Sequence, residues 1–497
     1  MSDFKFCGPS YVARSIYQND EECINWYPEI SQADFGGSPS TGQPAQRGSV
    51  TLYPAPGLLQ QIGPTSKDGV VTPSSLGTLG ARGFRVIPGG QALLAVYGAT
   101  LYKIDPLWNV TSVGTLLTNS GLVSMSDNGQ ALIIGDGFNR YFYNWGTNNF
   151  SISGDGAFTY AGICDVVDGF LLYTNPGTNQ WGATSNLSTT SQALSFATKF
   201  TAPDNLQGVQ VVNRDTYLIG EKTTEAWLDA GLFPFPFQII GGTSMQHGTG
   251  APNSISRLGE GFAMLAQDTR GDSTIISVNG YKPTRISTFA VEQAINDYSV
   301  TSDAFGMTHQ WGGHEFYMLT FPTADVTWVY DLGTQLWHKR AYRDANGVLH
   351  RHRASCMALF NGLVVVGDYQ SGILYTFSDS TYTDNGVAQP CIRRCPHLTE
   401  DLVRVFHNNL QIQFQPGVGL QTGQGVDPQA MLIWSDDGGS TWSNQHWTSI
   451  GKTGKYKNRA IWRRLGQSRD RIYEVQVTDP VNRVVVSANL NASAGAH

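Results

Sequence analysis

The chain has few charged residues. Asp, Glu, Lys and Arg make up 14% of its 497 residues, against roughly a quarter in an average globular protein. The 32 basic and 39 acidic residues leave a net charge of −7. This balance excludes a protein whose whole surface is positive, the usual state of a dedicated nucleic-acid binder.

Cysteine and long apolar runs are also scarce. The six cysteines are too few for a disulfide framework in a chain of this length, so we expect reduced thiols and assembly in a cytoplasm. No apolar run approaches the roughly 18 residues that cross a bilayer. The first residues lack a basic stretch followed by a long apolar one. The sequence therefore predicts neither membrane insertion nor ordinary secretory export.

Glycine and aromatic residues are plentiful, and a repeated hairpin pattern accompanies them. Each repeat is an apolar strand, a short turn rich in Gly, Asp or Asn, and a second strand that holds Tyr, Trp or Phe. The repeats begin at Ala92, Ala131, Phe170, Thr216, Phe262, Glu315 and Leu363. Successive starts are 39, 39, 46, 46, 53 and 48 residues apart, which is close to the 40 to 50 residues of a propeller blade.

The pattern predicts an all-β protein built on a β-propeller over residues 81–385. About seven blades are expected, and the drifting period is also compatible with six or eight. Several separate β-sandwiches would show similar short strands. Residues 1–80 are expected to form an extended interaction segment, whose stretches 31–49 and 64–77 are full of turn-forming residues.

Residues 386–497 are expected to form a small antiparallel β-domain. Leu410, Ile412 and Phe414 alternate with glutamines, which is typical of a half-buried strand. The same region holds SDDGGSTW, which matches the Asp-box pattern at Ser435, Asp437, Gly439, Thr441 and Trp442. An Asp box is a folding element in which the aspartate accepts backbone N–H groups across a turn and the glycine permits the turn dihedrals.

Motifs for chemistry are weak. FRVIP, at residues 84–88, is similar to the segment that carries one arginine of a sialidase carboxylate-binding triad, but Val86 interrupts the spacing. Cys391, Cys395 and His397 would suit zinc, yet a fourth ligand and paired knuckles are missing. We therefore predict no catalytic residue, no metal site, no cofactor and no enzymatic activity.

One basic cluster interrupts the acidic background. It comprises Lys452, Lys455, Lys457, Arg459, Arg463, Arg464, Arg469 and Arg471. Tyr456 and Trp462 are interleaved with these cations. Such a cluster can be a solvated face, can meet an acidic protein partner, or can neutralise phosphates.

Stretches at both ends of the chain resemble a known family. SYVARSIYQNDEECINWYPE (10–29), LYPAPGL (52–58), WSDDGGSTWS (434–443) and WRRLGQSRDRIYEVQVTDPV (462–481) are similar to the packaged-DNA stabilisation proteins of short-tailed bacteriophages, also called tail accessory factors or tail nozzle proteins. About a hundred residues carry this resemblance.

The resemblance implies a structural virion protein that assembles in the host cytoplasm and resides in the tail. It implies a hexameric homo-oligomeric ring below the portal and a head-to-tail adaptor. The ring would extend the channel for the double-stranded genomic DNA, retain that DNA, and support a tail needle, spike or fibre. We expect Trp26, Tyr27, Tyr53 and the basic cluster to form subunit or adaptor interfaces, because aromatic residues and arginine are enriched in interface cores.

An alternative function remains open on the sequence. A phage propeller could instead bind carbohydrate or act as a sialidase-like glycosidase, with aromatic loops such as GLFPFPF (231–237) as a sugar platform.

Overall fold

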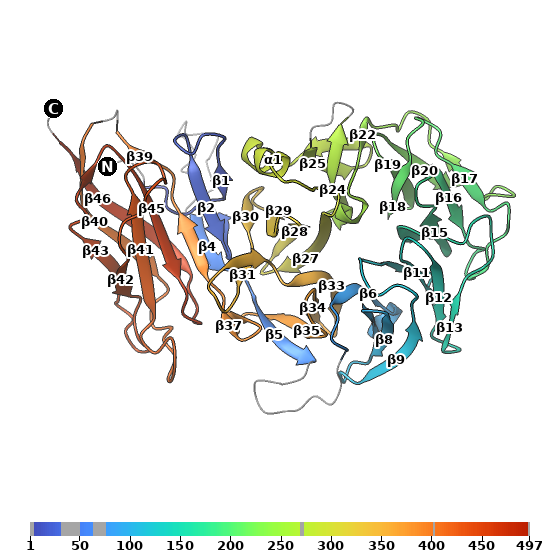
Figure 1. The fold of residues 1–497 in the computed structure, drawn as a ribbon, viewed down its shortest axis with the longest axis horizontal. Coiled ribbons are helices and arrows are strands. Elements are labelled where there is room, and N and C mark those ends of the chain that lie inside the picture. Colours follow the sequence, from blue (N-terminus) through green and yellow to red (C-terminus); the bar gives the residue numbers. More distant parts are fainter. Residues whose placement is uncertain (1–3, 31–49, 63–75, 269–272, 401–402, 496–497) are drawn as a thin grey trace, which may run out of the picture.

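The computed structural model describes residues 4–30, 50–62, 76–268, 273–400 and 403–495. These residues form a ring of β-sheets with a β-sandwich at one side, and both described ends of the chain lie at the sandwich (Figure 1). The predicted turn-rich stretch 31–49 and residues 64–75 of the stretch 64–77 lie outside the described residues.

Seven groups of strands in the described chain are the blades of a propeller; six of them are separate sheets, and blade 6 is one end of an 11-stranded sheet. Blade 1 comprises β6 (Ala81–Val86), β7 (Leu93–Tyr97), β8 (Thr100–Ile104) and β9 (Val110–Thr115). Blade 2 comprises β10 (Ser124–Asp127), β11 (Ala131–Gly135), β12 (Arg140–Asn144) and β13 (Asn149–Ile152). Blade 3 comprises β14 (Cys164–Val167), β15 (Phe170–Thr174), β16 (Gln180–Ala183) and β17 (Phe196–Thr198). Blade 4 comprises β18 (Leu206–Val212), β19 (Asp215–Gly220), β20 (Thr224–Asp229) and β21 (Phe237–Ile239).

The remaining blades carry additions. Blade 5 comprises β22 (His247–Gly248), β23 (Ser256–Leu258), β24 (Gly261–Asp268), β25 (Ser273–Asn279) and β26 (Lys282–Arg285), and is followed by α1 (Phe289–Asn296). Blade 6 comprises β27 (Phe305–Trp311), β28 (His314–Phe321), β29 (Val326–Asp331) and β30 (Trp337–Lys339). Blade 7 comprises β33 (Ala354–Phe360), β34 (Leu363–Asp368), β35 (Leu374–Ser378) and, from far upstream, β5 (Gly57–Ile62). Short pieces complete the propeller: η2 (Pro88–Gly90), η3 (Pro252–Ser254), β31 (Ala341–Arg343), β32 (Leu349–Arg351), β36 (Thr383–Asp384) and β37 (Val387–Ala388).

The middle strands of the blades explain the repeat in the sequence. All seven predicted hairpins are the second and third strands of a blade. In β11, Leu132 and Ile134 pack toward blade 1, while Ile133 packs toward blade 3. Because both faces of such a strand are buried between neighbouring blades, its sequence is continuously apolar. The propeller and the number of seven blades are thus confirmed.

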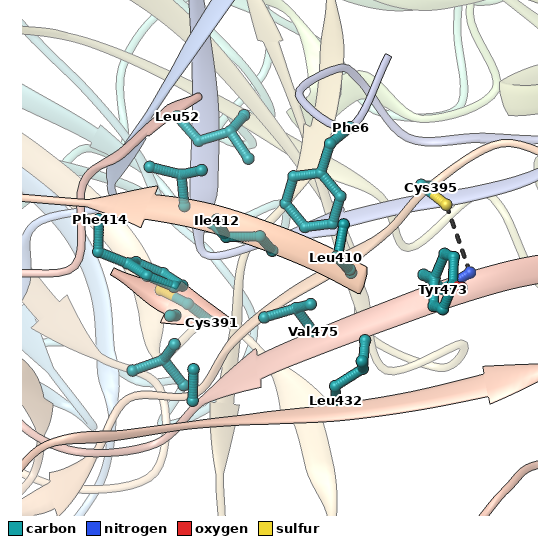
Figure 2. Packing of buried hydrophobic residues seen from close by; sticks show 14 of the residues in the cluster. Phe6, Leu52, Cys391, Cys395, Leu410, Ile412, Phe414, Leu432, Tyr473 and Val475 are labelled. Carbon is teal, nitrogen blue, oxygen red and sulfur yellow. Dashed lines mark hydrogen bonds between the residues drawn. The ribbon is translucent and has the colours of Figure 1, made fainter. Parts of the chain in front are cut away.

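The sandwich is built from both ends of the chain. Its first sheet contains β1 (Tyr11–Val12), β2 (Asp20–Ile24), β38 (Cys391–Arg394), β39 (Leu398–Thr399), β41 (Gln429–Ser435), β42 (His446–Ser449) and β45 (Asp470–Val477). Its second sheet contains β3 (Trp26–Ile30), β4 (Val50–Pro54), β40 (Val405–Phe414), β43 (Ala460–Arg463), β44 (Gln467–Ser468) and β46 (Val485–Ala494). Figure 2 shows the core between the sheets, in which Phe6 and Leu52 pack against residues such as Leu410 and Val475.

The first 62 residues contribute strands to both domains. β2 pairs with β38 of the sandwich and, in parallel at Ile24 and Lys339, with β30 of blade 6. One sheet thereby runs from the propeller into the sandwich. β5 then pairs with β35 and completes blade 7, as the blue strand among the orange strands of Figure 1 shows. A Cβ at Gly57 would lie 2.0 Å from the carbonyl oxygen of Thr381, so the start of β5 requires glycine.

Candidate assembly surfaces

The aromatic residues predicted at an interface lie largely inside the subunit. Trp26 is fully buried in the sandwich core, and its Nε1–H donates to the carbonyl oxygen of Arg483 at 2.9 Å. Tyr27 is buried against Phe316 of blade 6, and Tyr53 stacks on Tyr27 with ring centroids 6.0 Å apart. Trp26 and Tyr27 thus fasten the N-terminal strands to both domains, and their buried rings are not available to a neighbouring subunit. Tyr53 keeps partial exposure.

Trp26 offers a direct measure of that anchoring. Trp26→Ala is expected to lower the free energy of unfolding by about 3 to 5 kcal/mol, because it removes a large buried side chain and leaves the Arg483 carbonyl without its donor. Trp447→Ala, at a half-exposed tryptophan on β42, is the matched control and should change stability by only about 0.5 kcal/mol. Chemical denaturation of both variants measures the difference, and equal effects would contradict the anchoring role.

The basic cluster is almost entirely at the surface. Lys452, Lys455, Lys457, Arg459, Arg463, Arg464 and Arg469 are exposed. Arg471 differs, because its buried guanidinium forms a bidentate pair with Asp436 at 2.6 and 2.7 Å. Arg471 is therefore a structural residue of the sandwich and is removed from the candidate surface.

Along the chain the exposed cations form two groups around β43, which lies on the side of the sandwich away from the propeller (Figure 1). Four of them precede β43, and the other three lie at its end or beyond it. β43 is the last strand in the order of its sheet and pairs with β40 in the described chain. An edge strand with exposed cations resists unspecific strand pairing and can still meet an acidic partner.

The Asp box forms the turn between β41 and β42. Asp437 Oδ1 accepts the backbone N–H of Thr441 at 2.8 Å, and Ser435 Oγ accepts the N–H of Gly439 at 2.8 Å. Hydrogen bonds from Thr441 lower the pKa of Asp437 to about 2. Gly439 has a φ of 96°, which favours glycine. The indole of Trp442 lies 4.9 Å below the guanidinium carbon of Arg394, so the motif serves folding.

The segment considered for zinc is instead part of the sandwich, where β38 pairs with β2 and β45. Burial raises the pKa of the Cys391 thiol to about 11 and that of Cys395 to about 12, which opposes the thiolate that zinc requires. Nδ1 of His397 forms a hydrogen bond with Oδ2 of Asp470 at 2.7 Å. No group of three or more His, Cys, Asp or Glu that could hold a metal ion occurs in the described ranges.

Two arginines of this segment, which the sequence analysis did not single out, hold the N-terminal segment in place. Arg393 is buried and donates to the carbonyl oxygens of Phe6 and Pro9 and to Glu21, while Arg394 pairs with Asp20 and Glu474, each at 2.8 Å. The signal available in the sequence was an arginine pair on an otherwise apolar strand. These contacts fix the N-terminal segment onto the sandwich.

The axis of the propeller encloses a cavity of about 410 Å³ lined by the first strands of all seven blades. Arg85, the residue of the sialidase-like segment, lies in this lining and pairs with Asp127 at 2.5 Å.

In the GLFPFPF loop, Phe233 is exposed, while Phe235 and Phe237 pack on buried Trp181. No helix in the described part of the chain is long and apolar enough to cross a membrane.

Comparison with known proteins gives a family match over both domains. Residues 87–382 match the family model described as bacteriophage P22 Gp10, beta-propeller, and residues 392–493 match bacteriophage P22 Gp10, beta-sandwich. No curated protein matches the chain.

Solved structures give more distant similarities. A chain in a crystal structure of the mitotic checkpoint complex aligns with a TM-score of 0.41 and 11% identity, covering 69% of this chain and 96% of its own. The N-terminal domain of Nup159 aligns with a TM-score of 0.37 and 10% identity, and the alignment covers 66% of this chain and 95% of that domain's chain. A chain of hydrazine synthase from Kuenenia stuttgartiensis aligns with a TM-score of 0.41 and 10% identity, and the alignment covers 61% of this chain and 96% of its own.

Two consecutive family models thus cover the propeller and the sandwich in their order along the chain. The chain belongs to the bacteriophage P22 Gp10 family and is a structural protein of the phage tail.

Proposed function

We propose that the chain is the nozzle subunit of a short phage tail. Copies of it would form a ring, hexameric by the family resemblance, below the portal and its adaptor. The ring would extend the DNA channel, retain the packaged genome and hold the tail needle, spike or fibre, without an enzymatic role. The observation that carries this proposal is the match of both domains, in order, to one family of phage tail proteins.

The distribution of charge supports assembly into a ring. Residues 81–385 contain 16 basic and 24 acidic residues, a balance of −8, whereas residues 386–497 contain 12 basic and 8 acidic residues, a balance of +4. A closed ring of identical subunits uses two different surfaces that meet head to tail. A cationic sandwich edge facing the acidic propeller of the next copy satisfies this requirement with complementary charge.

The same distribution suits a channel for DNA. A lumen rich in Lys and Arg would hold phosphates strongly and slow the passage of the genome. With the exposed cations on the outer side of the sandwich engaged by a neighbouring subunit, the surface left for the lumen would carry the acidic balance of the propeller. A ring structure with Lys452–Arg469 lining the bore would contradict this arrangement.

Charge reversal at the end of β43 tests the interface. Arg463→Glu with Arg464→Glu is expected to block tail assembly while leaving the thermal unfolding of the isolated subunit nearly unchanged, because both side chains are exposed. Lys222→Glu with Lys282→Glu makes the same change in net charge at exposed propeller positions and is the control. Particles are examined by electron microscopy and nuclease protection after complementation of a nonsense mutant.

The nonsense mutant itself tests the wider role. Without the subunit, heads should package DNA and then lose it, and tails should be truncated. Full heads with tails of normal length but defective adsorption would overturn the nozzle role. Normal virions from the arginine double variant would remove the β43 cations from the interface and leave the nozzle role standing.

A further inference from the structure

Two sheet surfaces at opposite ends of the molecule carry no charge. At one end, β40 and β46 lie beside β43 on the side of the sandwich away from the propeller, and at the other end lies β13 of blade 2 (Figure 1). Residues 405–426 and 484–497 of the sandwich contain no Asp, Glu, Lys or Arg, and neither do residues 106–126 and 141–154 of the propeller. Such surfaces can leave water without burying a charge, as the core of an interface must.

Amide side chains cover the outward face of β40 and β46. Leu410 and its alternate neighbours on β40 pack in the sandwich core, so the side chains between them point outward. Gln411 of β40 stands opposite Asn489 of β46 in the ladder. None of the outward amides forms a hydrogen bond within the described residues, so each offers a free donor and a free acceptor. This surface, the amide face, comprises Asn409, Gln411, Gln413, Asn489 and Asn491.

The outer strands of blades 1 and 2 form the second surface. β9 and β13 are the last strands of their sheets, so one side of each leaves backbone N–H and C=O groups without a strand partner in the described chain. A Cβ at Gly114 would lie 2.4 Å from the ring of Phe150, so the two strands pack against each other. This surface, the blade 1–2 rim, has as its exposed side chains Thr111, Ser112, Thr115, Asn149, Ser151 and Ile152.

The blade 1–2 rim lacks the protection that exposed edge strands normally have. Charged side chains and proline keep such edges from pairing with other chains. The outer strand of blade 5, β26, follows this rule with Lys282, Pro283 and Arg285. β9 and β13 contain no charged residue and no proline. An unprotected edge of this kind is a hazard for a subunit unless another chain covers it in the assembly.

We propose that the amide face of one copy docks on the blade 1–2 rim of the next copy. An Asn or Gln side chain carries the same N–H and C=O groups as a peptide unit, so it can bond to both kinds of free group on an edge strand. The two surfaces differ and lie at opposite ends of the molecule, which suits the head-to-tail contact of a closed ring.

The cationic edge of β43 borders this contact. Arg463 of β43 stands opposite Asn409 in the ladder, so it lies at the margin of the amide face. An uncharged centre with charged residues around it is the usual anatomy of a protein interface. The inference rests on the proposed ring of subunits and specifies which two surfaces close it.

Cysteine cross-linking in assembled particles tests the contact. Asn489→Cys and Ser151→Cys are combined in one chain and treated with a flexible bis-maleimide, and the pair Asn489→Cys with Ser112→Cys repeats the test on β9. The paired positions lie at opposite ends of one copy, so only links between copies can form, and a ladder of products larger than a dimer is expected. Each single variant should give no more product than the parent chain, whose six cysteines set the background.

Three cross-linking results would overturn the inference. Absence of the ladder from both double variants would show that the two surfaces do not meet. Dimers from a single variant would show that like surfaces meet instead. A product that joins either position to a different tail protein would show that this other protein covers the surface.

Charge placed in the contact gives an independent measure. Asn489→Lys and Ser151→Lys are each expected to lower the yield of DNA-filled particles by about tenfold or more, because each buries an unpaired charge. Both positions are exposed in the subunit, so its thermal unfolding should not change. Gln238→Lys, at an exposed position on the outer strand of blade 4, is the matched control and should assemble normally.

Failure of this inference is distinguishable from failure of the nozzle role. Normal yields from both lysine variants would overturn the docking of the amide face on the blade 1–2 rim and leave the nozzle role standing. The nozzle role itself falls only if the nonsense mutant makes full heads with tails of normal length.

Discussion

Leu58→Asp is expected to open the propeller and to lower the free energy of unfolding by more than about 5 kcal/mol. Leu58 is 3% exposed and packs with Val366 and Phe377 in the core between blades 6 and 7. The substitution removes a buried apolar side chain and places an unpaired charge in its position, and each effect costs several kcal/mol. Release of β5 would also withdraw Ile62 from the core between blades 7 and 1.

Leu59→Asp is the matched control for this experiment. Leu59 neighbours Leu58 on the same strand but is 41% exposed, since successive side chains of a strand point to opposite faces. Its effect should stay within about 1 kcal/mol. Hydrogen exchange of the β35 amides together with thermal unfolding measures both variants. Unchanged protection of β35 in the Leu58 variant would show that β5 does not close the ring.

Acid is expected to destabilise the junction of blades 6 and 7 steeply. His309, His338 and His352 surround Arg340, and burial lowers the pKa of all three, that of His352 to about 3. Below about pH 6.5 a histidine of the unfolded chain binds a proton. A buried histidine with a lowered pKa stays neutral in the folded protein at the same pH. Each histidine therefore removes about 1.4 kcal/mol of stability per pH unit as the pH falls from 6.5 toward its folded pKa.

Three further histidines do not offset this loss. The pKa of His314, His350 and His397 is raised by hydrogen bonds to Asp331, Asp325 and Asp470 respectively. Below pH 6.5 these groups are protonated in both states, so their contribution is constant there. They lose their stabilising effect only as the pH rises through their folded pKa.

His338→Phe tests the acid response. Both ring nitrogens of His338 lack partners in the described chain, and the ring packs near Tyr27 and Phe316. Between pH 6.5 and 4.5 the slope of unfolding free energy against pH should fall by about 1.4 kcal/mol per unit. His350→Phe should leave the slope unchanged. An equal slope in the parent chain and the His338 variant would mean that this histidine does not titrate on unfolding.

The sequence predicts the propeller because its signal is local. Strands such as β7 and β11 are buried on both faces, which produces an apolar run, a turn and an aromatic strand at each repeat. The outer strand β9, VTSVGT, has no such signature because much of it is exposed. The closing role of β5 was not predicted, since the paired residues Leu59 and Thr376 lie more than 300 residues apart in the chain and no local pattern encodes their partnership.

The sequence predicts the exposed cations of the candidate surface but not the burial of its aromatic residues. Exposed lysines and arginines such as Lys455 and Arg463 are reliably placed outside, since burying an unpaired charge is costly. Trp26 was assigned to an interface because aromatic residues are enriched both there and in cores. Composition cannot separate these two environments. The pairing of β3 with β4 in the second sheet of the sandwich places Trp26 in the core.

The pairing of β5 with a strand far downstream imposes a delay during synthesis of the chain. Its partner strand follows at a separation of 317 residues, measured between Leu59 and Thr376. Ribosomes add about 5 to 20 residues per second, so β5 waits for roughly 15 to 60 s before its partner emerges. The N-terminal strand β4, which pairs with Val485, waits longer still. Throughout that interval the nascent chain carries unpaired strand edges, so the yield of subunits should depend on how well these strands are shielded during translation.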